Sequence, residues 1–169
     1  MDLEELEALR DELTETEDAD RYYIDPNWYE EHDLSFNDVI QGRFCPQCQE
    51  RIGEEAEERY PIADRRTGRV TYEMRSAKYG SRPVAVVKEC CSRKSGFIIP
   101  DMSVLEAVFR IMLANANQPM PLAHVKEQLK EWCPTGRCQW LVMPLDVLRQ
   151  VVRGDRHYGL RAYELPDVA

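Results

Sequence analysis

Phe44-Cys45-Pro46-Gln47-Cys48 is the stretch around which the rest of the chain can be interpreted. Two residues separate its cysteines, and the proline presets a tight turn that directs both sulfurs to one side. A second pair, Cys90-Cys91, follows after 41 intervening residues. One close pair, a long excursion and a second close pair predict a tetrahedral metal site.

The stretch Cys45-Pro46-Gln47-Cys48 resembles the knuckle of zinc-ribbon and rubredoxin-type sites. The resemblance implies a structural zinc ion with four protein ligands and no open position for water. The expected ligands are Cys45, Cys48, Cys90 and Cys91.

The second half of the pattern departs from that resemblance, because its cysteines are adjacent instead of being spaced by two residues. Adjacent cysteines can both bind one metal only with a particular backbone conformation. The alternative is that one of Cys90 and Cys91 binds and that the fourth ligand comes from elsewhere, with His32 as the nearest candidate by sequence position. The same cysteines are also compatible with an iron–sulfur cluster, with a redox-active Cys-x-x-Cys pair and with burial in the absence of metal.

Composition limits the classes of protein that fit the chain. Its 169 residues are 43% hydrophobic and 31% charged, with a net charge of −9. The sequence has no run of about 18 apolar residues, and its first residues are acidic, unlike a secretory signal. We therefore expect a cytoplasmic protein that makes no use of a membrane, whose six cysteines serve metal binding or thiol chemistry.

The acidity is concentrated at one end of the chain. Residues 1–40 hold 15 acidic and 2 basic residues, whereas residues 41–102 hold 9 acidic and 12 basic ones. The negative net charge of the whole chain therefore does not exclude an anionic partner. Nine basic residues of the middle segment are the predicted nucleic-acid contacts: Arg65, Arg66, Arg69, Arg75, Lys78, Arg82, Lys88, Arg93 and Lys94.

Leucines at helical spacing predict an amphipathic acidic helix over residues 2–15. It either docks on the body of the protein or covers the basic segment and competes with nucleic acid. The aromatic stretch Tyr22–Tyr29 is expected in the core, although a base-stacking platform is an alternative. Asp25-Pro26 predicts the start of a short helix, and Ser35 predicts the start of another.

The middle segment, residues 41–102, is expected to be a zinc-ribbon-like unit of antiparallel strands. A charged helix is predicted over 51–59, and strands are predicted over 69–74 and 83–88. The metal would then join the ends of these strands.

The C-terminal part predicts three short helices followed by a strand. Ser103 and Glu106 form a capping-box pattern, a second helix is expected over 121–132, and Pro144 begins a third. A strand is expected over 158–165, and residues 140–143 could pair with it. Cys133 and Cys138 are expected to be unpaired loop thiols.

This order of elements resembles a winged-helix domain over residues 103–166. The long loop at 133–143 departs from a helix-turn-helix that reads DNA, which has a turn of about three to four residues. The third helix also carries few bases for contact with a major groove, Arg149 and Arg153.

Taken together, the sequence predicts an α+β protein in three segments: an acidic helical arm with the aromatic stretch (1–40), the zinc-ribbon-like unit (41–102) and the winged-helix-like domain (103–169). No catalytic motif or small-molecule site is recognisable, so we expect a non-enzymatic zinc-binding module. The expected partner is nucleic acid or a nucleic-acid-bound complex of transcription or translation. The alternatives are a protein–protein adaptor with structural zinc and a thiol or iron–sulfur redox sensor.

Overall fold

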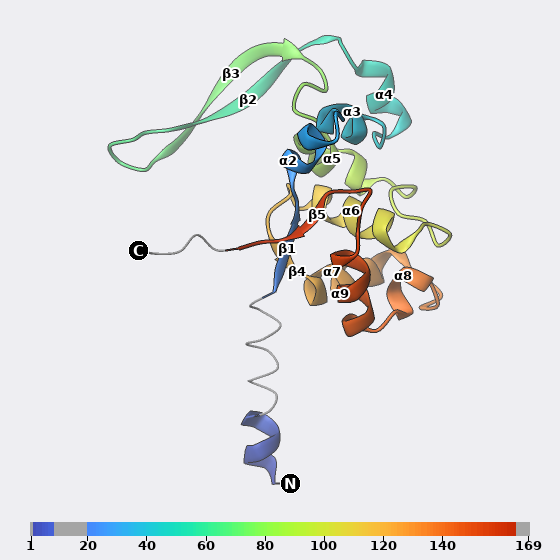
Figure 1. The fold of residues 1–169 in the computed structure, drawn as a ribbon. Helices are drawn as coiled ribbons and strands as arrows, with labels where there is room; N and C mark the ends of the chain where they lie inside the picture. The colour runs from blue at the N-terminus through green and yellow to red at the C-terminus, as the bar shows by residue number, and fades with distance from the viewer. Residues whose placement is uncertain (1, 9–19, 165–169) are drawn as a thin grey trace.

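Strand β1 (Arg21–Ile24) is the central strand of a sheet in the computed structural model, which describes residues 2–8 and 20–164. Its antiparallel neighbours are β4 (Met120–Pro121) and β5 (Leu160–Ala162), in the order β4-β1-β5 (Figure 1). The side-chain amide of Asn117 donates to the carbonyl of Ile24 and accepts from its N–H, each at 2.8 Å. The aromatic segment is therefore joined to β4, to β5 and to the loop that contains Asn117, all of which belong to the C-terminal part of the chain.

Three short helices follow β1: α2 (Pro26–Glu31), α3 (Phe36–Gln41) and α4 (Pro46–Arg51). The predicted starts of the first two are confirmed, because the Asp25 and Ser35 side chains accept hydrogen bonds from backbone N–H groups of the first turns. Trp28 and Tyr29 are buried, as Tyr22 is, so these aromatic residues serve the core. Their rings are not free to stack on bases.

Helix α6 (Val104–Ala114) is the centre of the core. The predicted cap is present, since the Ser103 hydroxyl accepts from the N–H of Glu106 at 3.3 Å. Most of its residues are buried, which is typical of a helix covered on all sides. It packs against β1 as well as against helices on either side of it in the sequence.

The remaining C-terminal elements largely follow the prediction. Helix α7 (Leu122–Leu129) continues into a 3-10 turn, η2 (Lys130–Trp132), and α9 (Leu145–Arg153) ends at Gly154. The predicted strand at 140–143 is wrong, because Gln139–Val142 forms helix α8. Trp140 is buried there, its indole N–H donates to the carbonyl of Ile99 at 3.1 Å, and β5 pairs with β1 instead.

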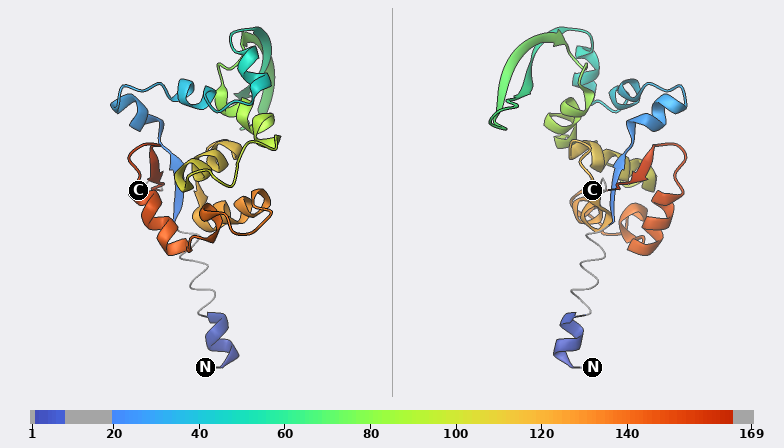
Figure 2. Two further views of the ribbon diagram at one scale, coloured as in Figure 1. Left: turned by 90° about the vertical axis from the view of Figure 1, so that its right-hand side faces the viewer. Right: turned by 60° about the vertical axis from the view of Figure 1, so that its left-hand side comes forward.

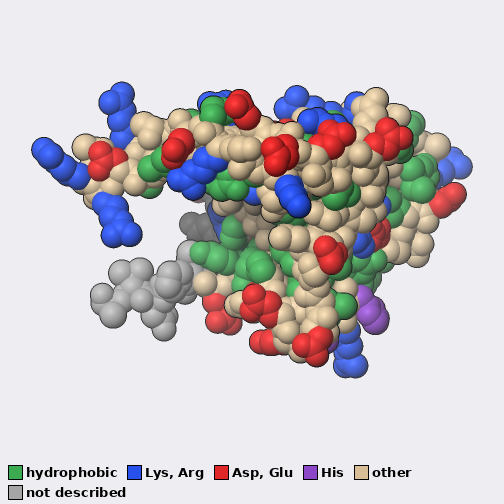
Figure 3. All heavy atoms as spheres, turned by 90° about the horizontal axis from the view of Figure 1, so that it is seen from above, with side chains coloured by type: hydrophobic (Ala, Val, Ile, Leu, Met, Phe, Trp, Pro, Cys, Tyr) green, Lys and Arg blue, Asp and Glu red, His purple; other side chains and the backbone are tan. Residues whose placement is uncertain are grey.

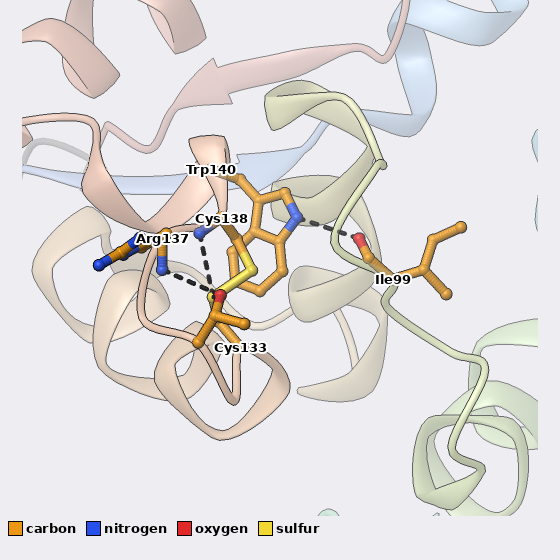
Figure 4. The surroundings of a disulfide bond; sticks show 6 residues. Ile99, Cys133, Arg137, Cys138 and Trp140 are labelled. Carbon is orange, nitrogen blue, oxygen red and sulfur yellow. Dashed lines mark hydrogen bonds between the residues drawn. A yellow bond between two sulfur atoms is a disulfide. The ribbon is translucent and has the colours of Figure 1, made fainter.

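Cys133 and Cys138 are joined by a disulfide, whereas unpaired thiols were expected. Figure 4 shows this bond beside the Trp140 indole, in the loop that leads into α8. Both cysteines are 5% exposed. The loop between the two cysteines folds back on itself, with a hydrogen bond from the Cys138 N–H to the Cys133 sulfur at 3.1 Å. This local turn keeps the two cysteines next to each other.

The middle segment contains a long hairpin of β2 (Glu55–Ala63) and β3 (Val70–Lys78). The strand predicted over 69–74 is confirmed, but the helix predicted over 51–59 is wrong. Opposite charges face each other across the hairpin, as in the pairs Glu55–Lys78 and Glu58–Arg75. A partner strand thus determines the conformation of a stretch that has helical composition by itself.

The strand predicted over 83–88 is also wrong, because Pro83–Glu89 forms helix α5, followed by a 3-10 turn, η1 (Cys91–Arg93). Pro83 occupies the first turn, where its missing N–H costs nothing. Val86 and Val87 are buried, and the helix packs on α3 and α6. Burial of this apolar face therefore overrides the β-propensity of the valines.

Residues 3–8 are helical, in agreement with the start of the predicted acidic helix, and residues 9–15 lie outside the described part of the chain. Leu3 and Leu6 are 78% and 51% exposed. Among the helices of the described residues, none is long and apolar enough to span a bilayer.

One hydrophobic cluster contains buried residues from 22–40, from 44–98 and from 107–160. The three segments distinguished by sequence therefore share a core.

Candidate metal centre

Cys45 and Cys48 are brought together by the start of a helix. Cys45 is the N-cap residue of α4 and Pro46 its first helical residue, so that Cys48 lies in the first turn. Cys48 is 2% exposed. A helix N-terminus carries partial positive charge, which favours the thiolate of Cys45.

Cys90 and Cys91 lie where α5 ends and η1 begins. Cys91 is 1% exposed, and Cys90 is partly exposed. The C-terminal end of α5 lies close to the start of α4, since the Cys91 sulfur is 3.2 Å from the Cys45 N–H nitrogen and the Cys90 sulfur is 3.5 Å from the Cys48 sulfur. Both cysteine pairs are therefore presented by helix ends, not by the ends of strands as a ribbon would have them.

The thiols of Cys45, Cys48 and Cys90 all lie within 4.8 Å of one another, close enough to hold a metal ion. The sulfurs of Cys48 and Cys90 are 3.5 Å apart. A zinc ion bound at about 2.3 Å to four sulfurs separates them by roughly 3.8 Å. These thiols therefore have nearly the spacing that a tetrahedral ion requires.

Cys91 is outside this group of three thiols but touches it. Its sulfur accepts a hydrogen bond from the backbone N–H of Cys45 at 3.2 Å. This bond places the Cys91 sulfur beside the backbone of Cys45.

The thiols differ in acidity. Burial raises the pKa of Cys45, but hydrogen bonds from the Cys48 N–H and from the neighbouring thiols together outweigh burial and lower it. The hydrogen bond with Cys48, together with burial, raises the pKa of Cys90 to about 11. Burial raises the pKa of Cys91 as well. A cation in the centre would offset the repulsion between these groups once they ionise.

Tyr79 contributes to the centre and was not anticipated from the sequence. Its hydroxyl donates to the sulfur of Cys48 at 3.2 Å, and the guanidinium of Arg51 lies 4.0 Å from its ring centroid. Burial and the bond to Cys48 raise the pKa of Tyr79, so the hydroxyl keeps its proton for donation. It lies between the two cysteine pairs in a position that no spacing motif marks.

His32, the proposed alternative ligand, is engaged elsewhere. Its Nδ1 lies 2.7 Å from the carbonyl oxygen of Trp28, and its ring stacks on that indole at 4.1 Å. The group of possible ligands found in the described residues consists of cysteines.

No protein-family model matches the chain, and comparison with curated proteins and with solved structures found no match either. What the centre does must therefore follow from its own chemistry. Thiolates are soft ligands that select zinc, copper(I) or iron–sulfur clusters over hard cations such as magnesium.

A pocket of about 480 Å³ lies beside Cys45 and Cys91. Two of its cationic residues are already paired, because Arg43 and Arg110 both bind the carboxylate of Glu106, at 2.8 and 2.9 Å. This triad joins the loop before Cys45 to helix α6. Its arginines therefore serve the docking of the cysteine segment on the core.

The predicted nucleic-acid contacts fall into three groups: in the turn of the hairpin, along β3, and at or beyond the base of the hairpin. Nine residue pairs at about 3.3 Å each separate its free end from its base by roughly 30 Å. Figure 3 shows basic side chains at the free end. Arg65, Arg66 and Arg69 lie in the turn there, Arg75 and Lys78 lie along β3, and Arg82, Lys88, Arg93 and Lys94 lie at or beyond its base.

The two arginines of α9 form ion pairs with an acidic residue just before β1. Arg149 Nε and Arg153 Nη2 lie 3.3 and 3.5 Å from a carboxylate oxygen of Asp20. Arg153 also donates to the hydroxyl of Tyr22 at 2.9 Å. These contacts hold the strand and the helix together, which leaves α9 with little free positive charge.

Proposed function

We propose that this protein is a non-enzymatic module in which a zinc ion bound by Cys45, Cys48, Cys90 and Cys91 supports a surface for nucleic acid or a nucleic-acid-bound complex. The observation that carries the proposal is the group of three thiols, from two segments far apart in the chain, within 4.8 Å of one another.

Zinc fits this donor set better than the other soft metals. Four thiolates around one ion form a closed tetrahedral site, which is the usual form of structural zinc. The donors from the Cys45 N–H and the Tyr79 hydroxyl are of the kind that orient and stabilise bound thiolates. The zinc would hold the start of α4 to the end of α5.

The assignment of a nucleic-acid partner is supported by charge and by architecture. Residues 41–102 carry an excess of three positive charges in a chain of net charge −9. The order α6, β4, α7, α8, α9, β5 contains the three helices and the final strand of the winged-helix-like domain expected over 103–166, with α8 as an additional short helix. A cytoplasmic location is part of the proposal, because the centre requires reduced thiols. In that compartment the Cys133–Cys138 disulfide would be kept from reduction by its burial, both cysteines being 5% exposed.

Metal analysis is the first test of the proposal. Protein purified without added metal should contain about one zinc per chain. Cys45→Ser should lose the zinc and lower the unfolding temperature, since binding free energy of a structural zinc is also folding free energy. Iron with visible absorption, or a folded protein without metal, would contradict the assignment of zinc.

The matched control is the double variant Cys133→Ser/Cys138→Ser. It also replaces cysteine by serine, but at the disulfide beside Trp140 instead of the centre. Its zinc content should remain that of the native chain. Loss of zinc in this control as well would indicate general misfolding.

The fourth ligand can be tested by replacing zinc with cobalt(II). Four thiolates give an intense thiolate-to-cobalt absorption, and Cys91→Ser should reduce it by about a quarter. An unchanged spectrum would mean that Cys91 only accepts the hydrogen bond from Cys45.

A thiol redox sensor is the second candidate, and the Cys133–Cys138 disulfide is the observation that favours it. In that case reduction of this disulfide alone should change the binding of a partner while the zinc content stays constant. A protein adaptor is the remaining candidate if the zinc is present and the native chain binds no nucleic acid below about 10 μM at low salt.

A further inference from the structure

The β2–β3 hairpin is built outside the core of the protein. It projects from the body in Figure 1, and the turned views of Figure 2 agree. Its residues are exposed or half-buried along both strands. An isolated two-stranded hairpin is at best marginally stable in water. A contact with another molecule would give such an extension its function.

Arginine–tyrosine contacts stiffen the hairpin. The guanidinium of Arg59 lies 4.6 Å from the ring centroid of Tyr72, and those of Arg75 and Arg82 lie 5.1 and 4.9 Å from that of Tyr60. At least one face of each ring is therefore occupied by a guanidinium group, although Tyr72 remains 61% exposed. A single-stranded nucleic acid, which binds by stacking bases on open aromatic faces, fits this surface poorly.

Charge is distributed unevenly along the hairpin. Its base is acidic on the β2 side, where four glutamates lie in residues 54–58. The turn at its free end carries Arg65, Arg66 and Arg69, and none of them forms an ion pair within the described residues. Along the two strands and their turn, attraction to a polyanion is therefore strongest at the tip.

The turn itself is fixed by its own hydrogen bonds. The carboxylate of Asp64 accepts from the N–H of Arg66 at 2.8 Å, and the backbone N–H of Gly68 donates to the carbonyl of Asp64 at 2.8 Å. Gly68 has a positive φ of 69°, which a side chain would disfavour. The three guanidinium groups thus extend from an ordered turn.

We infer that this hairpin enters the major groove of B-form DNA, with Arg65, Arg66 and Arg69 in contact with phosphates or guanine edges. A major groove about 12 Å wide admits a two-stranded ribbon, whereas the deep, narrow major groove of duplex RNA does not. The inference rests on the proposed nucleic-acid function and specifies its ligand as duplex DNA.

Two further observations fit this ligand. Val70, Tyr72 and Met74 share one face of β3 next to the tip and are 53%, 61% and 55% exposed. Apolar side chains in a major groove contact thymine methyl groups. The competing DNA-reading element, α9, has its Arg149 and Arg153 held by Asp20.

The test is fluorescence anisotropy with labelled duplex DNA, duplex RNA and single-stranded DNA of one sequence, over a range of salt concentrations. The native chain should bind duplex DNA most tightly. Neutralising the tip in Arg65→Gln/Arg66→Gln/Arg69→Gln should weaken this binding at least ten-fold at about 0.1 M salt. It should also reduce the slope of log K against log salt by about 2.7, for three lost phosphate contacts.

The matched control is Lys88→Gln/Arg93→Gln/Lys94→Gln, which neutralises three basic residues beyond the base of the hairpin. It has the same change of net charge but should keep most of the affinity and slope. Zinc content and circular dichroism of both variants should equal those of the native chain, because all six side chains are exposed. The hydrogen bond from Lys94 to Gln47, at 3.3 Å, is itself exposed, and the zinc content of the control shows whether the centre depends on it.

The outcomes separate this inference from the proposed function. Duplex DNA binding that the tip variant retains, or that the control loses equally, would overturn the hairpin contact and leave the module intact. Equal affinity for single-stranded DNA or for duplex RNA would also overturn the major-groove contact and leave the module intact. If the native zinc-loaded chain binds no nucleic acid, both fail, and a protein partner for the hairpin face takes their place.

Discussion

Tyr79 illustrates how a single residue can support the cysteine centre from outside the ligand set. Tyr79→Phe keeps the ring beneath Arg51 but removes the hydroxyl that donates to Cys48 at 3.2 Å. We expect zinc affinity to fall about 10- to 100-fold, as for other partners of metal ligands. Competition with a chelator of known affinity measures this.

Tyr72→Phe is the control for this substitution, since Tyr72 is 61% exposed on the hairpin and contacts no cysteine. It should bind zinc like the native protein. Equal affinities in both variants would show that the Tyr79 hydroxyl does not stabilise a bound thiolate.

Glu106 links the cysteine segment to α6 through its pair with Arg43, and it also pairs with Arg110 of its own helix; the three side chains are only 15–20% exposed. Burial raises the pKa of Glu106, but the hydrogen bonds and charges of the two arginines outweigh it and lower the pKa from 4.5. The stabilisation is therefore complete above about pH 4.5 and is lost as pH falls through the lower pKa of the folded state.

Glu106→Gln should accordingly lower the free energy of unfolding by about 2–4 kcal/mol at pH 7, because it leaves two arginines without their anion. The difference from the native protein should shrink below about pH 4. Urea unfolding at both pH values measures this. Glu127→Gln, in an exposed pair with Lys130, should cost less than about 1 kcal/mol, and a pH-independent difference for Glu106 would exclude the ionic explanation.

At the scale of elements, the junction between α2 and β5 depends on a glycine. Gly159 has a φ of 71°, and a Cβ added there would lie 3.0 Å from a ring carbon of Tyr29 and 3.3 Å from the Asp25 carbonyl. The carbonyl of Gly159 also accepts from the N–H of Asp25 at 2.8 Å. Strand and helix thus meet too closely for a side chain.

Gly159→Ala should therefore destabilise the protein by about 2–4 kcal/mol, through the strained φ and the contact with Tyr29. Gly136→Ala is the control, since Gly136 has a similar φ of 69° with nothing within 4 Å of an added Cβ. Gly136→Ala should lower the free energy of unfolding only by the cost of the positive φ, about 1 kcal/mol. Equal losses in thermal unfolding would show that crowding at Gly159 is unimportant.

The same scale shows where sequence patterns predict elements well. Helix starts at Asp25, Ser35 and Ser103 were predictable because a cap acts on its own first turn. The stretches 51–59 and 83–88 were not, because their conformations depend on what packs against them. A facing strand makes the first a strand, and burial on α6 makes the second a helix.

At the scale of the whole molecule, the acidic N-terminal segment is expected to oppose the binding of DNA. Residues 2–19 carry nine acidic residues and one basic residue. Their deletion should tighten DNA binding several-fold at low salt, with the difference fading as salt shortens the range of charge interactions to about 10 Å or less. Anisotropy titrations of both chains measure this.

The deletion should stop before Asp20, because this residue holds Arg149 and Arg153. A chain of native length, with the acids of 2–19 replaced by Asn and Gln, tests whether charge is responsible. It should match the deletion, whereas native-like affinity in either variant would leave the segment with no role in competition.

The sequence by itself determined the features that depend on neighbouring residues: the cysteine pairs, the helix caps, the amphipathic C-terminal helices and the uneven charge. A spacing of two residues brings Cys45 close to Cys48 whatever the rest of the chain does. Tertiary structure alone decided that Cys90 meets them, that Tyr79 donates to Cys48, and that β1 pairs with β4 and β5. These contacts join residues far apart in the chain, so they form only where a shared core, centred on α6, brings those residues together.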